Sequence, residues 1–291
     1  MLKYLLLSML LLLARPVFCQ KENPVTAHKS VTYDLAEALS KKLVALDIQS
    51  LGGHQGECLK IVCRSLRGQA LRLRIEQGQL LEPADSAQQT LVVAESRELA
   101  VSAKSPAEVL LRTFCTQAGE RSPTSGSTFA LGALATENLR QLLQFLVEKG
   151  KTAGGDAQNA VWCVTNGEPL GSIADPALLQ FTAKLLGKNP PGYTIKYRTA
   201  TTQPGERAGL GQALVVEGNY RYTLERDELI SLVLYDASGK LIKVLRKDEP
   251  MRAGEHRSSL RLQVYNLDPG RYFVRLEKKN KQLVKEIEVE F

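Results

Sequence analysis

Two short stretches of the chain carry residues that could react with each other. Cys115 lies in FCTQAGERSP, and Gln158 lies one turn before Trp162 in AQNAVWCVTNG. A cysteine thiol is a nucleophile and a disulfide former, and a glutamine side chain carries a carboxamide that a nucleophile can attack. Cys115 joined to Cys163 would make this region a disulfide-bonded structural domain. Cys115 joined to Gln158 would make it a site of covalent attachment.

The first residues of the chain have the form of a secretory signal. In MLKYLLLSMLLLLARPVFCQ, Lys3 supplies a positive start, and the apolar run 5–13 is too short to cross a bilayer as a helix. We therefore expect a signal peptide at 1–19 and a polar lead-in at 20–30. A lipid anchor on Cys19 is less favoured, because PVFC lacks the small residues that such a site needs.

Export places the mature chain in an oxidising compartment, where disulfides persist. The candidates are Cys58, Cys63, Cys115 and Cys163, and four cysteines allow three pairings. Cys58 and Cys63 lie in ECLKIVCRSL, which we predict to be a strand. Five steps along a straight strand separate them by roughly 16 Å on opposite faces, whereas a disulfide needs Cα atoms within about 7 Å. These two cysteines are not expected to pair unless a bulge intervenes.

Composition and charge argue against several classes of protein. Apolar residues are 44% and charged residues 24% of the chain, as in an ordinary globular protein. The net charge of +7 becomes +5 when Lys3 and Arg15 leave with the signal peptide. Apart from KKNK at 278–281, which we interpret as a turn, like charges are dispersed. A nucleic-acid partner is not expected, because it would need a concentrated basic face, and no transmembrane segment is predicted in the mature chain.

Motifs of the common catalytic and metal sites do not occur in the sequence. The histidines, His28, His54 and His256, lie in separate segments without the spacing of metal ligands. His54 lies in a glycine-rich turn near Cys58, and we interpret it as a turn residue. GxSxG, a phosphate loop and GxGxxG are also missing. We predict no catalytic residue, no metal and no cofactor, and an unrecognised hydrolase is retained only as an alternative without a named site.

Residues 31–198 are predicted to form a β-rich domain with a helical insert. ALRLRIEQG at 70–78 alternates apolar and basic residues, and short strands are expected at 90–94, 98–103 and 108–115. We expect a β-sandwich. Three helices should follow within 136–187, with the starts and ends expected from capping residues. The expected N-caps and stops are Thr136 and Gly150, Asp156 and Gly167, and Asp175 and Gly187.

The remaining chain is predicted to be a linker and a second β-sandwich. TTQPGERAGLGQ lacks periodicity, and we place a linker at 199–214. From 215 to 291, short apolar-alternating runs are separated by the turn signals ASG and DPG. Tyr272, Val274 and Leu276 are expected to face the core of this module.

The C-terminal run resembles the immunoglobulin-like domain of flagellar-hook capping proteins and the C-terminal sorting domain of type IX secretion cargo. The resemblance covers residues 219–291 and rests on LYDASGK, AGEH, NLDPGRYFVRL and a terminal lysine before alternating apolar residues. It implies a role in sorting, anchoring or display, with secretion machinery as a partner; a generic immunoglobulin-like accessory domain is the alternative. The opening Pro-Asn-Pro stretch of many sorting domains is missing. The motif residues are Gly239, Gly254, Pro269, Gly270, Tyr272 and Lys285.

Residues 114–167 resemble the thioester domains of bacterial surface adhesins. Those domains carry an aromatic-Cys pair and, after a helical stretch, a glutamine before Ala-(Ile/Val)-Trp. Phe114-Cys115 and Gln158-Asn159-Ala160-Val161-Trp162 are the counterparts here. The resemblance implies that the cysteine sulfur attacks the carboxamide, releases ammonia and forms a thioester, which then captures an amine on a host surface.

The two bonds available to Cys115 exclude each other on geometric grounds. On a helix, Gln158 and Cys163 lie about 140° apart at opposite borders of the apolar face, so Cys115 cannot reach both. Four mature cysteines can form two disulfides, whereas a thioester leaves three, and this count favours a disulfide using Cys115. Trp162 would then be a core residue between the helix and the sandwich.

We therefore expect an exported, mainly β protein that is secreted to the cell surface, the extracellular space or the periplasm. The first expectation for its function is a non-enzymatic surface protein whose N-terminal module binds an extracellular protein or glycan. Covalent adhesion through Cys115 and Gln158 is the alternative.

Overall fold

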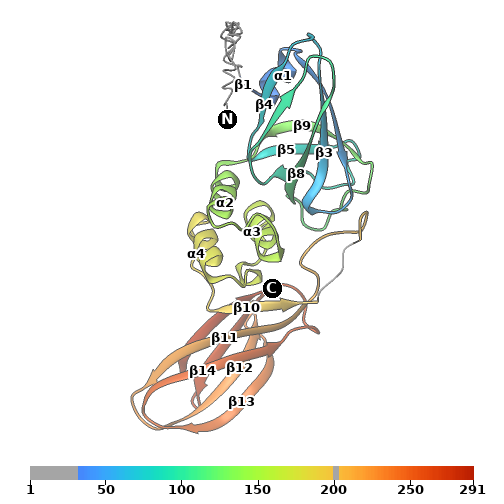
Figure 1. Ribbon diagram of the computed structural model, residues 1–291. Coiled ribbons are helices and arrows are strands. Elements are labelled where there is room, and N and C mark those ends of the chain that lie inside the picture. The colour runs from blue at the N-terminus through green and yellow to red at the C-terminus, as the bar shows by residue number, and fades with distance from the viewer. Residues whose placement is uncertain (1–31, 199–202) are drawn as a thin grey trace, which may run out of the picture. The chain divides into compact units, whose positions relative to one another are not determined.

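The computed structural model describes residues 32–198 and 203–291. The predicted signal peptide, the lead-in and Cys19 lie outside the described residues. The predicted fold class is confirmed: the chain is mainly β, with a helical insert between two β-rich parts (Figure 1). In the described ranges, none of the helices is both long and apolar enough to span a bilayer.

The first β-rich part is built around a closed six-stranded barrel, a form of closure that the alternation of residues did not indicate. Its strand order is β2-β3-β8-β6-β5-β9. The strands are β2 (Val44–Ser50), β3 (Gln55–Ser65), β8 (Ala107–Cys115), β6 (Leu91–Val93), β5 (Gln79–Pro83) and β9 (Thr128–Leu134). The apolar side chains that point inward from these strands form one continuous core, as expected where alternate residues face the inside of a barrel.

A small second sheet and a short helix pack against this core. The sheet has the order β1-β4-β7. Its elements are β1 (Thr32–Asp34), β4 (Leu71–Ile75), β7 (Arg97–Val101) and the helix α1 (Leu35–Ser40). In β4 the predicted alternation is observed, because Leu73 and Ile75 are fully buried while Arg72 and Arg74 are exposed.

Three α-helices follow near the predicted positions. They are α2 (Glu137–Glu148), α3 (Gly155–Asn166) and α4 (Pro176–Leu185), with a 3-10 turn, η1 (Leu170–Ser172), before α4. Asp175 caps α4 as predicted, since its carboxylate accepts the N–H of Leu178 at 2.9 Å. The prediction that Asp156 caps the second helix is wrong: Gly154 is the cap, and Asp156 accepts the backbone N–H of Asp175 at 2.9 Å.

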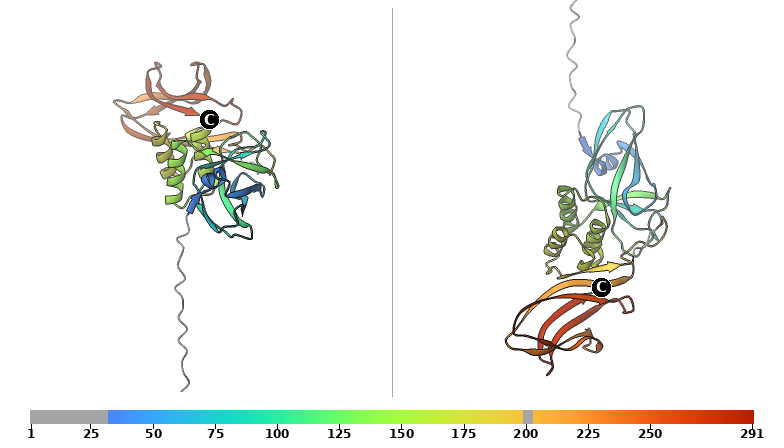
Figure 2. Two further views of the ribbon diagram at one scale, coloured as in Figure 1. Left: turned by 90° about the horizontal axis from the view of Figure 1, so that it is seen from above. Right: turned by 60° about the horizontal axis from the view of Figure 1, so that its bottom comes forward.

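The helices share a core with the outer face of the barrel. Helix α3 contacts both α2 and α4, and the three helices are grouped together in each view of Figure 2. Phe114 on β8 points outward into the helical core, whereas its neighbour Cys115 belongs to the barrel core. Helix α3 is likewise buried on two sides, because Trp162 packs in the barrel core and Cys163 packs in the helical core.

The described part of the predicted linker packs back onto the barrel. Ser122 donates its N–H to the Glu206 carbonyl at 2.8 Å, and Gly119 donates to the Ala208 carbonyl at 2.7 Å. Ala208 is fully buried and joins the barrel core. A segment without hydrophobic periodicity therefore forms part of the wall around the end of strand β8.

The second β-rich part consists of two sheets that enclose a third core. One sheet has the order β10-β11-β14 and the other β13-β12-β15-β16. The strands are β10 (Tyr193–Tyr197), β11 (Ala213–Leu224), β14 (Gly254–Gln263), β13 (Leu241–Met251), β12 (Glu228–Asp236), β15 (Arg271–Lys278) and β16 (Leu283–Glu290). Strand β10 comes from the region expected to end the first domain, yet it pairs with β11 of this sheet.

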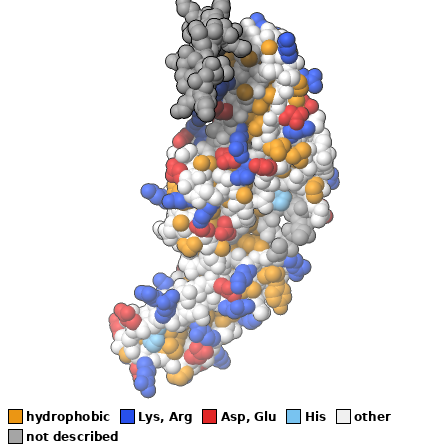
Figure 3. Space-filling view, viewed as in Figure 1, with side chains coloured by type: hydrophobic (Ala, Val, Ile, Leu, Met, Phe, Trp, Pro, Cys, Tyr) orange, Lys and Arg blue, Asp and Glu red, His pale blue; other side chains and the backbone are white. Residues whose placement is uncertain are grey.

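Acidic and basic side chains are interspersed on the face of the molecule in Figure 3. This face carries no concentrated basic patch, in line with the ordinary solvated surface that the dispersed charges of the sequence indicate.

Candidate functional site

The carboxamide of Gln158 is paired with the backbone of Cys115. Gln158 Oε1 accepts the Cys115 N–H at 3.0 Å, and Gln158 Nε2 donates to the Cys115 carbonyl at 2.8 Å. These are the two hydrogen bonds that a residue of a neighbouring antiparallel strand would otherwise make. Cys115 is fully buried and Gln158 is 1% exposed. Two residues that are 43 positions apart in the sequence are thus brought into direct contact.

Three elements position this pair. Cys115 is the last residue of β8, and it lies beyond the last β3 pairing, which joins Gln55 to Phe114. Its backbone groups therefore need another partner, because buried peptide groups are costly to leave unpaired. Gln158 lies in the first turn of α3 and supplies that partner. Trp162 follows one turn later and lies on the same face of the helix.

The thiol of Cys115 points to the turn before β3. Its Sγ donates to the His54 carbonyl at 3.0 Å. Throughout residues 32–198 and 203–291 the cysteines are free thiols, so the structure gives the predicted disulfides no support. Cys163, the proposed disulfide partner, instead lies 3.7 Å from Ser172 Oγ in the helical core. Cys58 lies 3.1 Å from Thr113 Oγ1.

Strand β3 contains a bulge at Cys58, the feature that could bring Cys58 and Cys63 onto one face. The pairing of β3 with β8 shifts register between Glu57 and Leu59, which makes Cys58 the extra residue. As a result Cys58 and Cys63 both belong to the barrel core and do not lie on opposite faces of the strand. Neither forms a disulfide in the structure.

A glycine-rich turn covers the Cys115 thiol. Gly52 and Gly53 adopt φ values of 98° and 101°, which residues other than glycine rarely adopt. The turn places the half-buried His54 beside Trp162, with 6.5 Å between ring centroids and 15° between ring planes. Within the described chain, the buried Nε1 of Trp162 has no hydrogen-bond partner. A buried N–H donor is therefore left unpaired one helical turn from Gln158.

Burial controls the protonation of this cluster. Burial raises the pKa of the Cys115 thiol well above its usual value, and repulsion from the nearby Cys58 adds a smaller increase. Burial also raises the pKa of Cys163, to about 12, and of Cys63, to about 11. The pKa of His54 is lowered by burial, so its imidazole is neutral near pH 7. The Cys115 thiol is thus protonated, and the residue whose backbone carbonyl it contacts carries a neutral imidazole.

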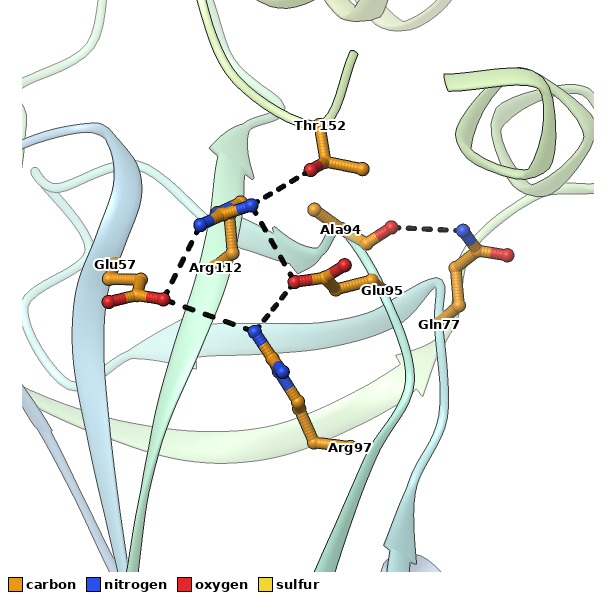
Figure 4. A network of polar contacts seen from close by, with 7 residues as sticks. All are labelled: Glu57, Gln77, Ala94, Glu95, Arg97, Arg112 and Thr152. Carbon is orange, nitrogen blue, oxygen red and sulfur yellow. Dashed lines mark hydrogen bonds and ion pairs between the residues drawn. The ribbon is translucent and has the colours of Figure 1, made fainter. Parts of the chain in front are cut away.

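An ion network links the barrel to the loop before α3 (Figure 4). Arg112 lies 3.4 Å from Glu57 and 3.8 Å from Glu95, and Arg97 lies 2.7 Å from Glu95. Arg112 also donates to Thr152 Oγ1 at 3.1 Å. Because these charges are partly exposed, each pair contributes little to stability. The network nevertheless connects strand β8, three residues before Cys115, to the segment that leads into α3.

Of the candidate residues named from the sequence, the structure brings together Cys115, Gln158 and Trp162, and it separates Cys163 from them. The sequence indicates only a turn at His54 and does not predict the contact of its carbonyl with Cys115. A signal was present in GGHQG, since a histidine between glycines is free to approach another segment closely. The contact itself spans 61 positions of sequence, which no local pattern reports.

The sorting-motif residues lie at both ends of the second sandwich and on one of its strands, with Gly239, Gly270 and Tyr272 at one end and Gly254 at the other. Gly239 forms the turn between β12 and β13, and Gly270 exchanges two backbone hydrogen bonds with Phe291. Tyr272 donates to the Asp268 carbonyl at 2.9 Å and stacks on Phe291 at 5.1 Å. The predicted inward direction of Tyr272, Val274 and Leu276 is confirmed by their burial. Gly254, Pro269 and Lys285 lie at the start of β14, in the turn before β15 and on β16.

Residues 217–290 match the family model described as a secretion system C-terminal sorting domain. This match bears out the predicted resemblance of the last module and indicates a secreted protein that is attached to the cell surface. The match covers the last quarter of the chain and leaves the barrel and the helices unassigned.

Comparison with curated proteins finds no match to the chain. Among solved structures, a calcium-binding mutant of β-glucuronidase 2 from Bacteroides uniformis matches 81% of this chain at 12% identity and a TM-score of 0.23. The chain spans only 26% of that enzyme. A β-glucosidase from Kluyveromyces marxianus matches 80% of this chain and 44% of its own length, at 9% identity and a TM-score of 0.19.

The CBM51-2 and INT domains of Clostridium perfringens ZmpB match 84% of this chain and 77% of their own length, at 10% identity and a TM-score of 0.17. Likeness at these TM-scores carries no argument about fold or activity.

Proposed function

We propose that the barrel and helices form a covalent binding module, in which Cys115 and Gln158 join as an internal thioester that captures an amine. The observation that carries this proposal is the pair of hydrogen bonds between the Gln158 carboxamide and the Cys115 backbone. The carboxamide carbon lies between the two bonded heteroatoms and therefore faces the residue whose sulfur would attack it.

The reaction needs only groups that this chain supplies. The Cys115 sulfur attacks the Gln158 carboxamide carbon, the C–N bond breaks, and the amide nitrogen leaves as ammonia. An incoming amine later attacks the same carbon, forms an amide and returns the thiol of Cys115. In the structure the thiol points to the His54 carbonyl, so a rotation about χ1 of Cys115 is the movement that the first step requires.

The surroundings favour a long-lived acyl group. Cys115, Gln158 and Trp162 are each 3% exposed or less, and a thioester is preserved only where water is kept away. The glycine-rich turn at 52–56 and the returning segment at 203–210 lie over this end of the barrel. We infer that an amine reaches the site only when this cover moves.

The second module fits the delivery of such a binding module to the cell surface. The sorting-domain match supports export and surface attachment. We propose a division into a barrel-and-helix domain and a sandwich domain, with β10 belonging to the second. In this arrangement the sandwich holds the reactive domain at the surface, where amines of a neighbouring cell or matrix are the substrates.

A non-covalent role is the second candidate, and one observation favours it. Gln158 satisfies the backbone groups of Cys115 just beyond the first residue of β3, which is sufficient reason for a buried glutamine at this position. In that case the barrel and helices would bind an extracellular protein or glycan without a covalent bond.

The intact mass of the mature protein separates the two candidates. A thioester makes the chain lighter by one ammonia, and methylamine should then add to Gln158. Cys115→Ala and Gln158→Ala should abolish both effects. Cys163→Ala and Gln79→Ala are matched controls, because they remove a buried thiol and a buried, backbone-bonded glutamine outside the pair. If freshly purified protein has the mass calculated without loss of ammonia and takes up no methylamine, the covalent function is refuted and the non-covalent role is favoured.

A further inference from the structure

The proposed thioester requires a proton acceptor that its two partners do not supply. The thiol must lose its proton before or during attack, because the thiolate is the nucleophile. Burial makes that loss unfavourable at Cys115. The departing amide nitrogen must in turn gain a proton, because an unprotonated amide is a poor leaving group. A single group that accepts the first proton and donates the second would meet both needs.

His54 is placed to be that group. Its backbone carbonyl accepts the Cys115 thiol at 3.0 Å, which fixes the residue directly against the sulfur. Its ring lies beside Trp162 in a nearly parallel orientation. Trp162 is one helical turn from Gln158, so the imidazole lies beside the face of α3 that carries the carboxamide.

The charged groups near His54 leave it as the available base. Cys115 from β8 bonds the His54 carbonyl, and Cys58 from β3 lies against the preceding Gly53. The nearest carboxylate along the chain is Glu57, three residues after His54, which Arg112 holds in the ion network. Helix α3 contributes Trp162, which does not titrate, and the returning segment contributes Pro204 beside Gly52. The thiols are proton donors here, and the carboxylate of Glu57 is committed to two arginines.

We propose that the imidazole of His54 is the proton-transfer group of the Cys115–Gln158 site. This inference rests on the proposed function. The imidazole takes the proton from the Cys115 thiol as the sulfur forms its bond to the carboxamide carbon of Gln158. The imidazolium then gives that proton to the amide nitrogen as the C–N bond breaks, and ammonia leaves. In the capture step it takes a proton from the incoming amine and returns one to the Cys115 sulfur.

The turn that carries His54 explains why a histidine can serve here. Gly52 and Gly53 take backbone conformations that bring the turn over the end of the barrel. The imidazole is half-buried, so it can exchange protons with solvent while the thiol and carboxamide stay dry. The same turn would therefore cover the acyl group and connect it to bulk water through one titrating side chain.

The test compares rates in the mature full chain. Methylamine uptake by the thioester is followed by intact mass in the wild type, His54→Gln and His54→Ala, with His256→Gln in the C-terminal module as the matched control. General acid–base catalysis is worth at least about 100-fold, so we expect both His54 variants to lose about that factor. His256→Gln should react at the wild-type rate. Added imidazole should restore the rate of His54→Ala, which a purely structural role would not allow.

The outcomes distinguish this inference from the function on which it rests. If the wild type forms no thioester, both ideas fail. If the wild type reacts and His54→Gln reacts within about threefold of it, His54 transfers no proton and the thioester proposal stands. A His54→Ala rate that stays low at every imidazole concentration, with unchanged thermal unfolding, also overturns the inference, because the missing base would then have been replaced without effect.

Discussion

Replacement of Gln158 by alanine tests how much the carboxamide holds the barrel and helices together. The measurement is best made in a Cys115→Ala background, where no thioester can form while the backbone N–H and carbonyl of residue 115 remain. Gln158→Ala then removes two buried hydrogen bonds. Each backbone group left without a partner costs about 1–3 kcal/mol. We expect the free energy of unfolding to fall by about 2–6 kcal/mol.

Trp162 makes this change measurable in the relevant domain. It is the single tryptophan of the chain, and it is buried one turn from Gln158. Urea unfolding followed by its fluorescence therefore reports the barrel and helices and not the sandwich. With a slope of about 1–3 kcal/mol per molar urea, the midpoint should fall by about 0.7 M or more.

A surface glutamine provides the control. Gln144→Ala removes an exposed side chain that bonds only to Glu148, and it should change the free energy of unfolding by less than about 0.5 kcal/mol. A Gln158→Ala effect as small as that of Gln144→Ala would refute the reasoning, because the Cys115 backbone would then not depend on the carboxamide.

Three further predictions concern the network, the sandwich and pH. Arg112→Ala should cost about 1 kcal/mol or less by the same fluorescence assay, because its ion pairs are partly exposed; a loss above about 3 kcal/mol would contradict this. Tyr272→Phe should destabilise the sandwich by about 1 kcal/mol through loss of the bond to Asp268, and Tyr272→Ala by about 3–5 kcal/mol, as followed by far-ultraviolet circular dichroism. His54 has a lowered pKa in the fold, so the unfolded chain binds more protons and stability should fall as pH drops below about 6.5. An equal fall in His54→Gln would rule out this cause.

Local pattern was sufficient for much of the architecture. In α2, the residues predicted to share one face, Leu139, Leu142, Leu143 and Leu146, are all buried. The alternation in β4 and β15 likewise indicated which side chains face a core. These predictions succeeded because the period of apolar residues directly sets which face of an element is buried. The motifs of the last module were also local, and its sorting-domain resemblance was confirmed.

The sequence was a weaker guide to which side chains cap the helices. Asp175 caps α4 as its sequence indicates, but Asp156 bonds the backbone before α4 and does not cap its own helix. An aspartate satisfies whichever buried N–H groups tertiary packing brings within reach. Capping patterns therefore located the three helices but did not fix the partner of each carboxylate.

The sequence by itself determined the mainly β fold class, the helical insert and the nature of the C-terminal module. Tertiary structure alone decided that the barrel closes, that β10 joins the second sandwich, that residues 203–210 return to the barrel, and that His54 lies over Cys115. Periodicity is a property of neighbouring residues, whereas these contacts depend on the path of the chain and on the entropy of closing long loops. The pairing of Cys115 with Gln158 depends on both the sequence and the tertiary structure. Its residue types were visible in the sequence, and their contact was decided by where β3 and α3 begin.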